Sequence, residues 1–220
     1  FQMPRSAEQI PLASPREENE MLLPMISEAI ERVILGGRYM LGPQVEAFER
    51  ALSVELQVAA AVGVGSGTDA LVLALLALGV GAGDEVVTVS HTAGPTVAAI
   101  NMIGATPVFI DVTEQTCCMA PGLLEAAFTD RTKAIIAVHL YGHPADMISI
   151  QAIAERRGIA VIEDCAQAQG ATIGGRNVGT FGDVGCLSFY PTKNLGAIGD
   201  GGAVVTNRME IAVRLRGLRT

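Results

Sequence analysis

Short apolar stretches alternate with helix patterns along most of the chain, and this alternation restricts the possible folds more than any other feature. Apolar strands rich in Val and Ile, separated by helices, are typical of a mainly parallel sheet with helices on both faces. We therefore expect an α/β fold with a mainly parallel, mixed sheet. The expected strands are residues 59–64, 85–89, 107–111, 134–138 and 160–164, and the helices between them are residues 69–78, 96–103, 121–128 and about 146–157.

The N-terminal residues do not follow this alternation. Residues 1–16 are polar and contain several prolines, which favours a loose arm. A helix pattern then begins at Glu17 and ends at Gly36-Gly37. We expect an arm, residues 1–16, followed by one domain, residues 17–220. Because the sequence starts without a methionine and stops directly after a helix pattern, we also expect it to be part of a longer protein.

Composition and charge exclude several classes of partner. The formal net charge of the 220 residues is −8 and no basic stripe is visible, so we expect no nucleic-acid partner. No apolar run reaches about 18 residues, which argues against a membrane span. The four cysteines form no CxxC pair and have no histidine at zinc spacing, so free thiols in a reducing compartment are expected. These features together predict a cytoplasmic protein.

The first chemical signal is a lysine in a glycine-rich segment. Lys193 follows an apolar run that ends at Phe189 and precedes the segment 196–202, which contains four glycines. A lysine held between buried strands is either paired with a carboxylate or has a lowered pKa, and the second state makes its amine a nucleophile. An ordinary lysine of a surface loop is the alternative.

The second signal is the turn Gly65-Ser66-Gly67-Thr68 between a predicted strand and a predicted helix. Free backbone N–H groups and a hydroxyl at a helix N-terminus form a general phosphate site. The alternative is that Ser66 or Thr68 only caps the helix. Neither GxGxxG nor the Walker pattern is present here.

The third signal is Asp164, at the end of a Val-Ile strand. Ligands of parallel sheets bind beyond the carboxyl ends of the strands. A buried carboxylate is costly unless it meets a cation or hydrogen-bond donors. Asp164 is therefore either a partner for a protonated ring nitrogen or a cap for the N–H groups near Ala166.

Together these motifs resemble the fold type I pyridoxal phosphate (PLP) enzymes, and more narrowly the DegT-like nucleotide-sugar aminotransferases. The resemblance covers residues 18–220, nearly the whole chain. Besides the three signals above, the matching stretches are residues 38–43, 83–86, 104–111, 131–136, 138–147 and 179–183. The resemblance implies that the chain is the large, PLP-binding domain, and that the smaller C-terminal domain lies outside it.

The resemblance also implies roles for particular residues. Lys193 forms the Schiff base with PLP and later moves protons, and Asp164 pairs with the pyridine nitrogen. Gln167 lies near the ring oxygen. Asn194 reaches the phosphate site of a neighbouring subunit, because the family builds its active sites across a homodimer. The residues expected to hold the phosphate are Gly67, Thr68 and Ser188.

One departure from the family pattern concerns the cofactor ring. Members commonly carry an aromatic residue after the strand 86–89, whereas this chain has Ser90-His91-Thr92-Ala93. His91 can stack on the ring in its place, or it can be a loop histidine.

The expected reaction is transamination of a keto nucleotide sugar, with glutamate as the amino donor. The segments Ser90-His91-Thr92 and 196–202 favour a dTDP-linked 3-keto-deoxyhexose. Related sugar dehydratases replace the Schiff-base lysine by histidine, so Lys193 favours transamination. Two other classes stay open: a dinucleotide-binding oxidoreductase, whose glycine fingerprint is missing, and a PLP-binding regulator without catalysis.

Overall fold

A computed structural model describes residues 14–219, and the chain forms two compact units, residues 1–39 and 40–220. The described part of the first unit is the helix α1 (Arg16–Gly36), which confirms the helix predicted from Glu17. Gly37 ends α1 with a φ of 64°, a left-handed conformation that glycine adopts without strain. The predicted arm, residues 1–16, lies mostly outside the described residues. The boundary between the two units follows α1 rather than preceding it.

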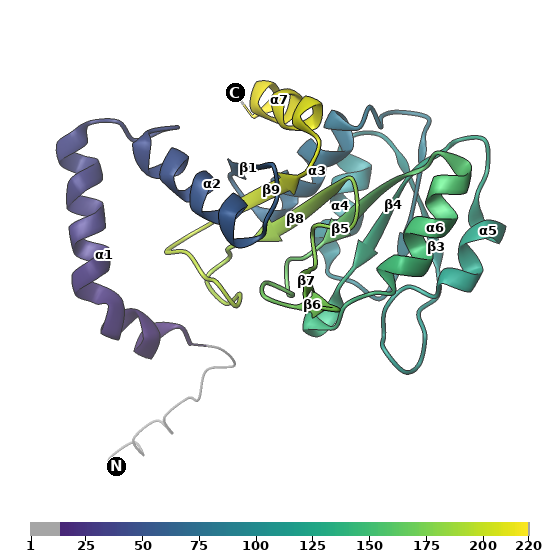
Figure 1. Ribbon diagram of the computed structural model, residues 1–220, viewed down its shortest axis with the longest axis horizontal. Coiled ribbons are helices and arrows are strands. Elements are labelled where there is room, and N and C mark those ends of the chain that lie inside the picture. Colours follow the sequence, from purple (N-terminus) through teal and green to yellow (C-terminus); the bar gives the residue numbers. More distant parts are fainter. Residues whose placement is uncertain (1–13, 220) are drawn as a thin grey trace, which may run out of the picture. The chain divides into compact units, whose positions relative to one another are not determined.

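The second unit is built on a seven-stranded sheet with the order β1-β9-β8-β5-β4-β2-β3 (Figure 1). Every neighbouring pair is parallel except the two pairs made by β9. This confirms the mainly parallel, mixed sheet. The strands are β1 (Ala60–Val64), β2 (Glu85–Val89), β3 (Thr106–Ile110), β4 (Thr132–Val138), β5 (Ala160–Asp164), β8 (Val184–Ser188) and β9 (Gly202–Thr206).

Helices cover both faces of this sheet, as the alternation predicted. In the view of Figure 1, α6 lies in front of the sheet and α3 and α4 lie behind it. The predicted helix 121–128 is shorter than expected, because Pro121–Leu123 forms a 3-10 turn before α5, and a small hairpin of β6 (Thr172–Ile173) and β7 (Arg176–Asn177) was not predicted. The helices of this unit are α2 (Pro43–Glu55), α3 (Gly67–Ala77), α4 (Gly94–Met102), α5 (Leu124–Ala127), α6 (Met147–Arg157) and α7 (Met209–Leu218).

Successive residues of β1 show how the core is divided by the sheet. Val62 packs in the cluster that contains Leu71 of α3, whereas Ala61 packs in the second cluster with Leu52 of α2. Because side chains of a strand alternate between faces, α2 and α3 cover opposite faces. The buried, close-packed strands therefore form a rigid base, and the loops at their ends carry the polar chemistry.

The carboxyl ends of the parallel strands lie at one end of the sheet, and the antiparallel strand β9 begins at this same end. Ser188, the last residue of β8, pairs with Gly202, the first residue of β9. The Phe189 N–H donates to the Gly201 carbonyl oxygen at 2.8 Å, and the Ala197 N–H donates to the Phe189 carbonyl oxygen at 2.7 Å. The loop that contains Lys193 is therefore held at both ends by the sheet.

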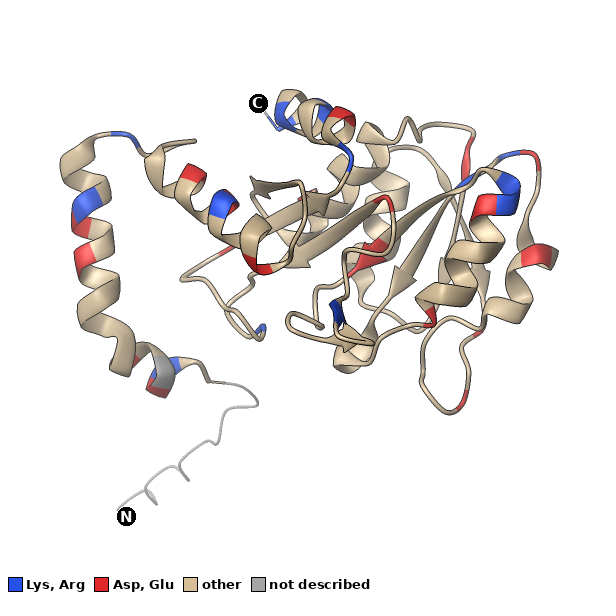
Figure 2. Cartoon of the chain, viewed as in Figure 1, with Lys and Arg blue, Asp and Glu red and all other residues tan. Residues whose placement is uncertain are grey.

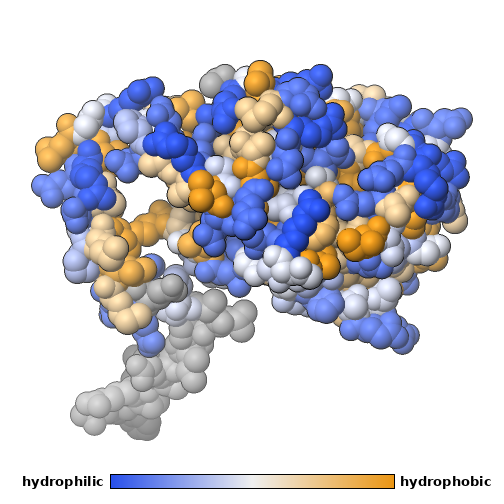
Figure 3. All heavy atoms as spheres, in the orientation of Figure 1, coloured by the Kyte–Doolittle hydropathy of each residue, from blue (hydrophilic) through white to orange (hydrophobic). Residues whose placement is uncertain are grey.

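Acidic side chains outnumber basic ones, 23 to 15 in the full sequence, and both kinds occur along the chain. In Figure 2, Lys and Arg alternate with Asp and Glu on the helices, and the described part of the chain shows no basic stripe. Figure 3 shows that apolar side chains also lie on the surface. The exposed apolar residues of α1 include Met21, Met25 and Leu35. Among residues 14–219, no helix combines the length and apolarity needed to cross a membrane.

Candidate active site

A cavity of about 260 Å³ lies beyond the carboxyl ends of β1, β5 and β8. Five of the predicted site residues line it: Gly67, Thr68, Asp164, Ser188 and Lys193. The structure thus brings together the three chemical signals of the sequence, which are separated by up to about half of the chain. The remaining lining residues are Ser66, Leu71, Ala93, Pro95, Thr96, Ala166, Tyr190, Asp200 and Gly201.

One wall of the cavity is the turn that joins β1 to α3. The Ser66 hydroxyl accepts the Asp69 N–H at 3.0 Å and so caps α3. The hydroxyl of Thr68 takes no part in this cap. Gly67 lies so close to Ser188 that an added Cβ would be 2.6 Å from the Cβ of Ser188. Glycine is therefore required for the close approach of the two segments. The N-terminus of α3 faces this cavity and favours an anion there.

The opposite side of the cavity carries the buried carboxyl group of Asp164, which is only 6% exposed. Its Oδ1 accepts the Ala166 N–H at 3.1 Å, and its Oδ2 accepts the Thr96 hydroxyl at 2.9 Å. Burial raises the pKa of this carboxyl above its ordinary value, although the two hydrogen bonds and the charge of Lys193 oppose the change. A cationic group in the cavity would relieve the cost of the ionised form. The expected cap near Ala166 and a cation partner are therefore both compatible with this geometry.

Lys193 is half-buried in the loop between β8 and β9. Its backbone N–H donates to the Tyr190 carbonyl oxygen at 2.8 Å, which fixes the turn that presents the side chain. The cavity therefore combines an amine, a buried acid and an anion-binding turn. PLP carries a phosphate, an aldehyde and a ring nitrogen, so these three groups fit the cofactor.

Three predicted residues are not among those that line the cavity: His91, Gln167 and Asn194. Gln167 uses its Oε1 atom to accept the Tyr141 N–H at 2.8 Å, and Tyr141 has a φ of 57°, an uncommon conformation for a residue with a side chain. The ring of His91 meets the ring of Tyr141 edge-on, with centroids 5.9 Å apart. Asn194 is exposed. The roles expected for these residues stay predictions.

If His91 stacks on the cofactor ring, His91→Ala should raise the dissociation constant of PLP about three- to tenfold, the usual worth of an aromatic pair. His91→Phe should restore most of the affinity, because stacking requires a flat ring and no proton. Equilibrium dialysis of PLP against the three proteins measures this. An unchanged dissociation constant in His91→Ala would leave only the role of a loop residue.

Behind the cavity lies a buried hydrogen-bond network that the sequence reasoning missed. The Glu163 carboxylate accepts three backbone N–H groups of the segment 179–182 at 2.7 to 2.8 Å and the Nε2 atom of His139 at 3.0 Å. The Nδ1 atom of His139 accepts the Ala145 N–H, so Nε2 carries the proton. His139, Glu163 and Cys165 lie close enough together to suggest a metal site. However, four hydrogen bonds already occupy the acceptor positions of Glu163, so its carboxylate has no position left for a metal ion.

Thr96, Tyr190 and Asp200 also line the cavity and were not predicted as site residues. Asp200 belongs to the glycine-rich segment 196–202, which was predicted only to favour a particular sugar substrate. Thr96 follows Gly94-Pro95 at the start of a helix. Its position gave no signal, because its partner Asp164 is 68 residues further along the chain.

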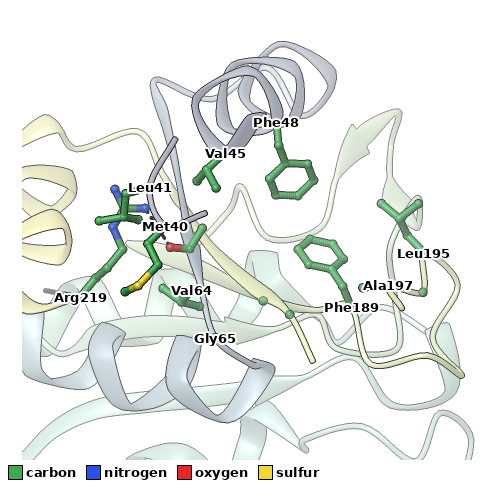
Figure 4. Close-up of a pocket in the computed structure, with 14 residues that line it drawn as sticks. Met40, Leu41, Val45, Phe48, Val64, Gly65, Phe189, Leu195, Ala197 and Arg219 are labelled. Carbon is green, nitrogen blue, oxygen red and sulfur yellow. Dashed lines mark hydrogen bonds between the residues drawn. The ribbon is translucent and has the colours of Figure 1, made fainter. Parts of the chain in front are cut away.

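An apolar groove of about 700 Å³ lies beside the lysine loop (Figure 4). Phe48 of α2 and Phe189 face each other in it, with ring centroids 5.3 Å apart and planes at 88°. The groove also contains the side chains of Met40, Leu41, Val45, Val64, Leu195, Ala197 and Arg219. Its apolar lining distinguishes it from the polar cavity.

The parallel sheet, the lysine loop, the buried acid and the turn before α3 are the features expected of a fold type I PLP-dependent enzyme. The chain belongs to the DegT/DnrJ/EryC1/StrS aminotransferase family, which residues 23–220 match. The recognised resemblance, the α/β fold and the PLP cofactor are thereby confirmed.

Several known proteins are similar to this chain. A dTDP-3-amino-3,4,6-trideoxy-alpha-D-glucose transaminase of Micromonospora megalomicea subsp. nigra is 54% identical over 194 residues, which are 88% of this chain and 52% of that relative. The crystal structure of S. venezuelae DesV in complex with a ketimine intermediate is 47% identical, with a TM-score of 0.93 over 97% of this chain and 58% of DesV. The structure of NtdA from Bacillus subtilis with bound cofactor PMP is 36% identical, with a TM-score of 0.84 over 98% of this chain and 49% of NtdA. The chain thus spans about half the length of the relatives it matches.

Proposed function

We propose that the protein containing this chain is a PLP-dependent aminotransferase that converts a keto nucleotide sugar into an amino sugar. The observation that carries the proposal is the convergence of Lys193, Asp164 and the turn at Gly67 on one cavity. When bound, PLP supplies an electron sink and carries the amino group between two substrates. The chain's residues bind and orient the cofactor and move protons.

Each residue of the cavity has a role that follows from its chemistry. The Lys193 amine attaches the cofactor and, once released, takes and returns the proton at the substrate carbon as a general base. Asp164 stabilises a protonated ring nitrogen by its charge. Gly67, Thr68 and Ser188 hold the phosphate through N–H and hydroxyl groups at the start of α3. Gln167, whose Oε1 is committed to Tyr141, can direct only its NH₂ group to the ring oxygen.

The substrate that we propose is a dTDP-linked 3-keto-deoxyhexose, with glutamate as the amino donor, in the synthesis of a deoxyaminosugar. The name of the Micromonospora relative, which is 54% identical, supports the sugar. Lys193 favours transamination over the dehydration catalysed by family members with histidine at this position. A regulator without catalysis would not need the lysine, the acid and the phosphate turn in one cavity.

We also propose that two copies of the chain form a homodimer with shared active sites. The apolar groove beside the lysine loop supports this, because its neighbours Met40 and Leu195 are 83% and 53% exposed, and large exposed apolar patches mark interaction sites. Asn194 follows Lys193 but does not line the same cavity, so its amide is available to a second copy.

We also propose that the protein is cytoplasmic, since its four cysteines are free thiols. Cell fractionation checks this location.

The experiment that tests the function uses the full-length protein. It is incubated with glutamate and a set of dTDP- and UDP-linked 3-keto and 4-keto sugars, and the amino sugars are measured by mass spectrometry. We expect turnover of the dTDP-linked 3-keto sugar and a dimer by analytical ultracentrifugation of the same preparation. Absence of PLP binding and of any amino sugar would contradict the enzyme class, and a monomer with full activity would contradict the shared site.

A further inference from the structure

Two threonine hydroxyls connect the loop after β2 to the buried acid of the cavity. The Oγ1 atoms of Thr92 and Thr96 are 2.8 Å apart, and Thr96 Oγ1 is 2.9 Å from Asp164 Oδ2. Thr96 is completely buried, and Thr92 is partly buried. The result is a chain of two hydrogen bonds from the loop after β2 to the carboxyl group.

The direction of these hydrogen bonds follows from the chemistry of the groups. An ionised carboxylate only accepts, so Thr96 must donate its single proton to Asp164. The oxygen of Thr96 can then accept the proton of Thr92. A neutral Asp164 with its proton on Oδ2 would reverse this direction, and one with its proton on Oδ1 would accept the Thr96 hydrogen more weakly than the carboxylate does. The pair of hydroxyls therefore favours the charged form.

The same contacts fix the orientation of the carboxyl group. Thr96, in the first turn of α4, binds Oδ2, and the Ala166 N–H, beyond the end of β5, binds Oδ1. Two donors from separate elements define the plane of the carboxylate. Each oxygen keeps a second acceptor position, so the group can still receive a donor from the cavity.

No other side chain near Asp164 in the described part of the chain provides the hydrogen bond that Thr96 donates. Lys193, in the loop after β8, acts on the carboxyl through its charge. His139, after the end of β4, uses both ring nitrogens for Ala145 and Glu163. The thiols of Cys165 and Cys186 have pKa values raised by burial, so they remain neutral. The adjacent Glu163 is saturated by its own four donors. Among residues 14–219, the Thr96 hydroxyl is the only side-chain group that donates a hydrogen bond to the Asp164 carboxyl.

We propose that Thr96 and Thr92 are positioning residues, which hold the Asp164 carboxylate ionised and oriented toward a cationic ring nitrogen of the cofactor. The proposal rests on the proposed role of Asp164 in the aminotransferase. Thr96 acts directly on the acid, and Thr92 acts through Thr96. Neither residue needs to contact the substrate.

The test measures the protonation of Asp164 in the full-length protein without cofactor. The infrared band of its protonated carboxyl is identified by subtraction of the Asp164→Asn spectrum and is followed against pH. Thr96→Val, which removes the hydroxyl but keeps the shape, should change the ratio of protonated to ionised acid at fixed pH by about tenfold in favour of protonation, because a hydrogen bond to a charged group is lost. Thr96→Ser should restore the wild-type ratio, and Thr92→Val should produce a smaller change in the same direction.

A second measurement separates positioning from general damage. The dissociation constant of PLP is measured in Thr96→Val with and without Asp164→Asn. We expect weaker binding in Thr96→Val alone and no further loss when Asp164 is already Asn. An unchanged infrared titration in a folded Thr96→Val, or an equal loss of PLP affinity in the Asp164→Asn background, would overturn the proposal. Because the titration needs no cofactor, a protein that failed to bind PLP would contradict the proposed function and leave this result standing.

Discussion

Lys193→Ala should abolish the transamination activity of the full-length protein while leaving its fold intact. The variant loses both the amine that attaches PLP and the base that moves the substrate proton, so we expect a decrease in kcat of about 10⁴-fold or more, the upper range for a lost acid–base group. The visible absorption band of lysine-bound PLP should disappear. Absorption spectroscopy and single-turnover assays measure the two effects, and circular dichroism verifies the fold.

The sequence offers a matched control for this experiment. Lys133 is the only other lysine among the 220 residues, and its side chain is exposed on β4. Lys133→Ala should therefore leave the band and the rate unchanged. Borohydride reduction of the wild-type protein should fix the cofactor on the peptide that contains Lys193. Retention of the wild-type rate in Lys193→Ala would show that another group attaches the cofactor.

Asp164→Asn should lower kcat by about 10³-fold, the range observed when one electrostatic group of an active site is removed, but should still allow PLP to bind. A neutral amide cannot favour a protonated pyridine nitrogen, and an unprotonated ring is a poor electron sink. Lys193 and the turn at Gly67 would still hold the cofactor. The measurement is the single-turnover rate together with the dissociation constant of PLP.

The control for this variant is an exposed carboxylate of the same charge. Asp130 lies on the surface before β4, and Asp130→Asn should retain the wild-type rate. The two variants have the same net charge, so a general charge effect would affect them equally. Near-normal kcat in Asp164→Asn would show that the acid does not act on the ring nitrogen.

The fold and the centre of the site were predictable because their signals are local. The five residues of β5 contain both the apolar run that predicts a strand and Asp164 at its end. The glycines around Gly67 directly indicate a turn from a strand to a helix. The contact of Thr96 with Asp164 and that of Gln167 with Tyr141 depend instead on the packing of segments that are distant in sequence. Thr96 meets Asp164 only because β2 and β5 lie on either side of β4. A hydroxyl on a helix does not reveal such a partner.

The predicted helix 121–128 shows a limit of another kind. Its periodic apolar residues were read correctly, but Gly122 and the residues after Pro121 start the segment as a 3-10 turn, and only Leu124–Ala127 is α-helical. Glycine lowers helix stability, and a segment this short gains little from cooperativity. Tertiary packing of Leu124, which is fully buried, therefore decides its conformation.

The antiparallel strand β9 has a consequence for how this family can diversify. Since β8 and β9 form a hairpin whose tip is the segment 189–201, the reactive amine belongs to a local unit that is closed by neighbouring residues such as Phe189 and Gly201. Substitutions at exposed tip positions that line the cavity, such as Asp200, can reshape it while the paired strands keep the lysine in place. Surface loops tolerate such changes better than the strands do. Substrate preference and cofactor attachment can thus evolve separately, although they share one short segment.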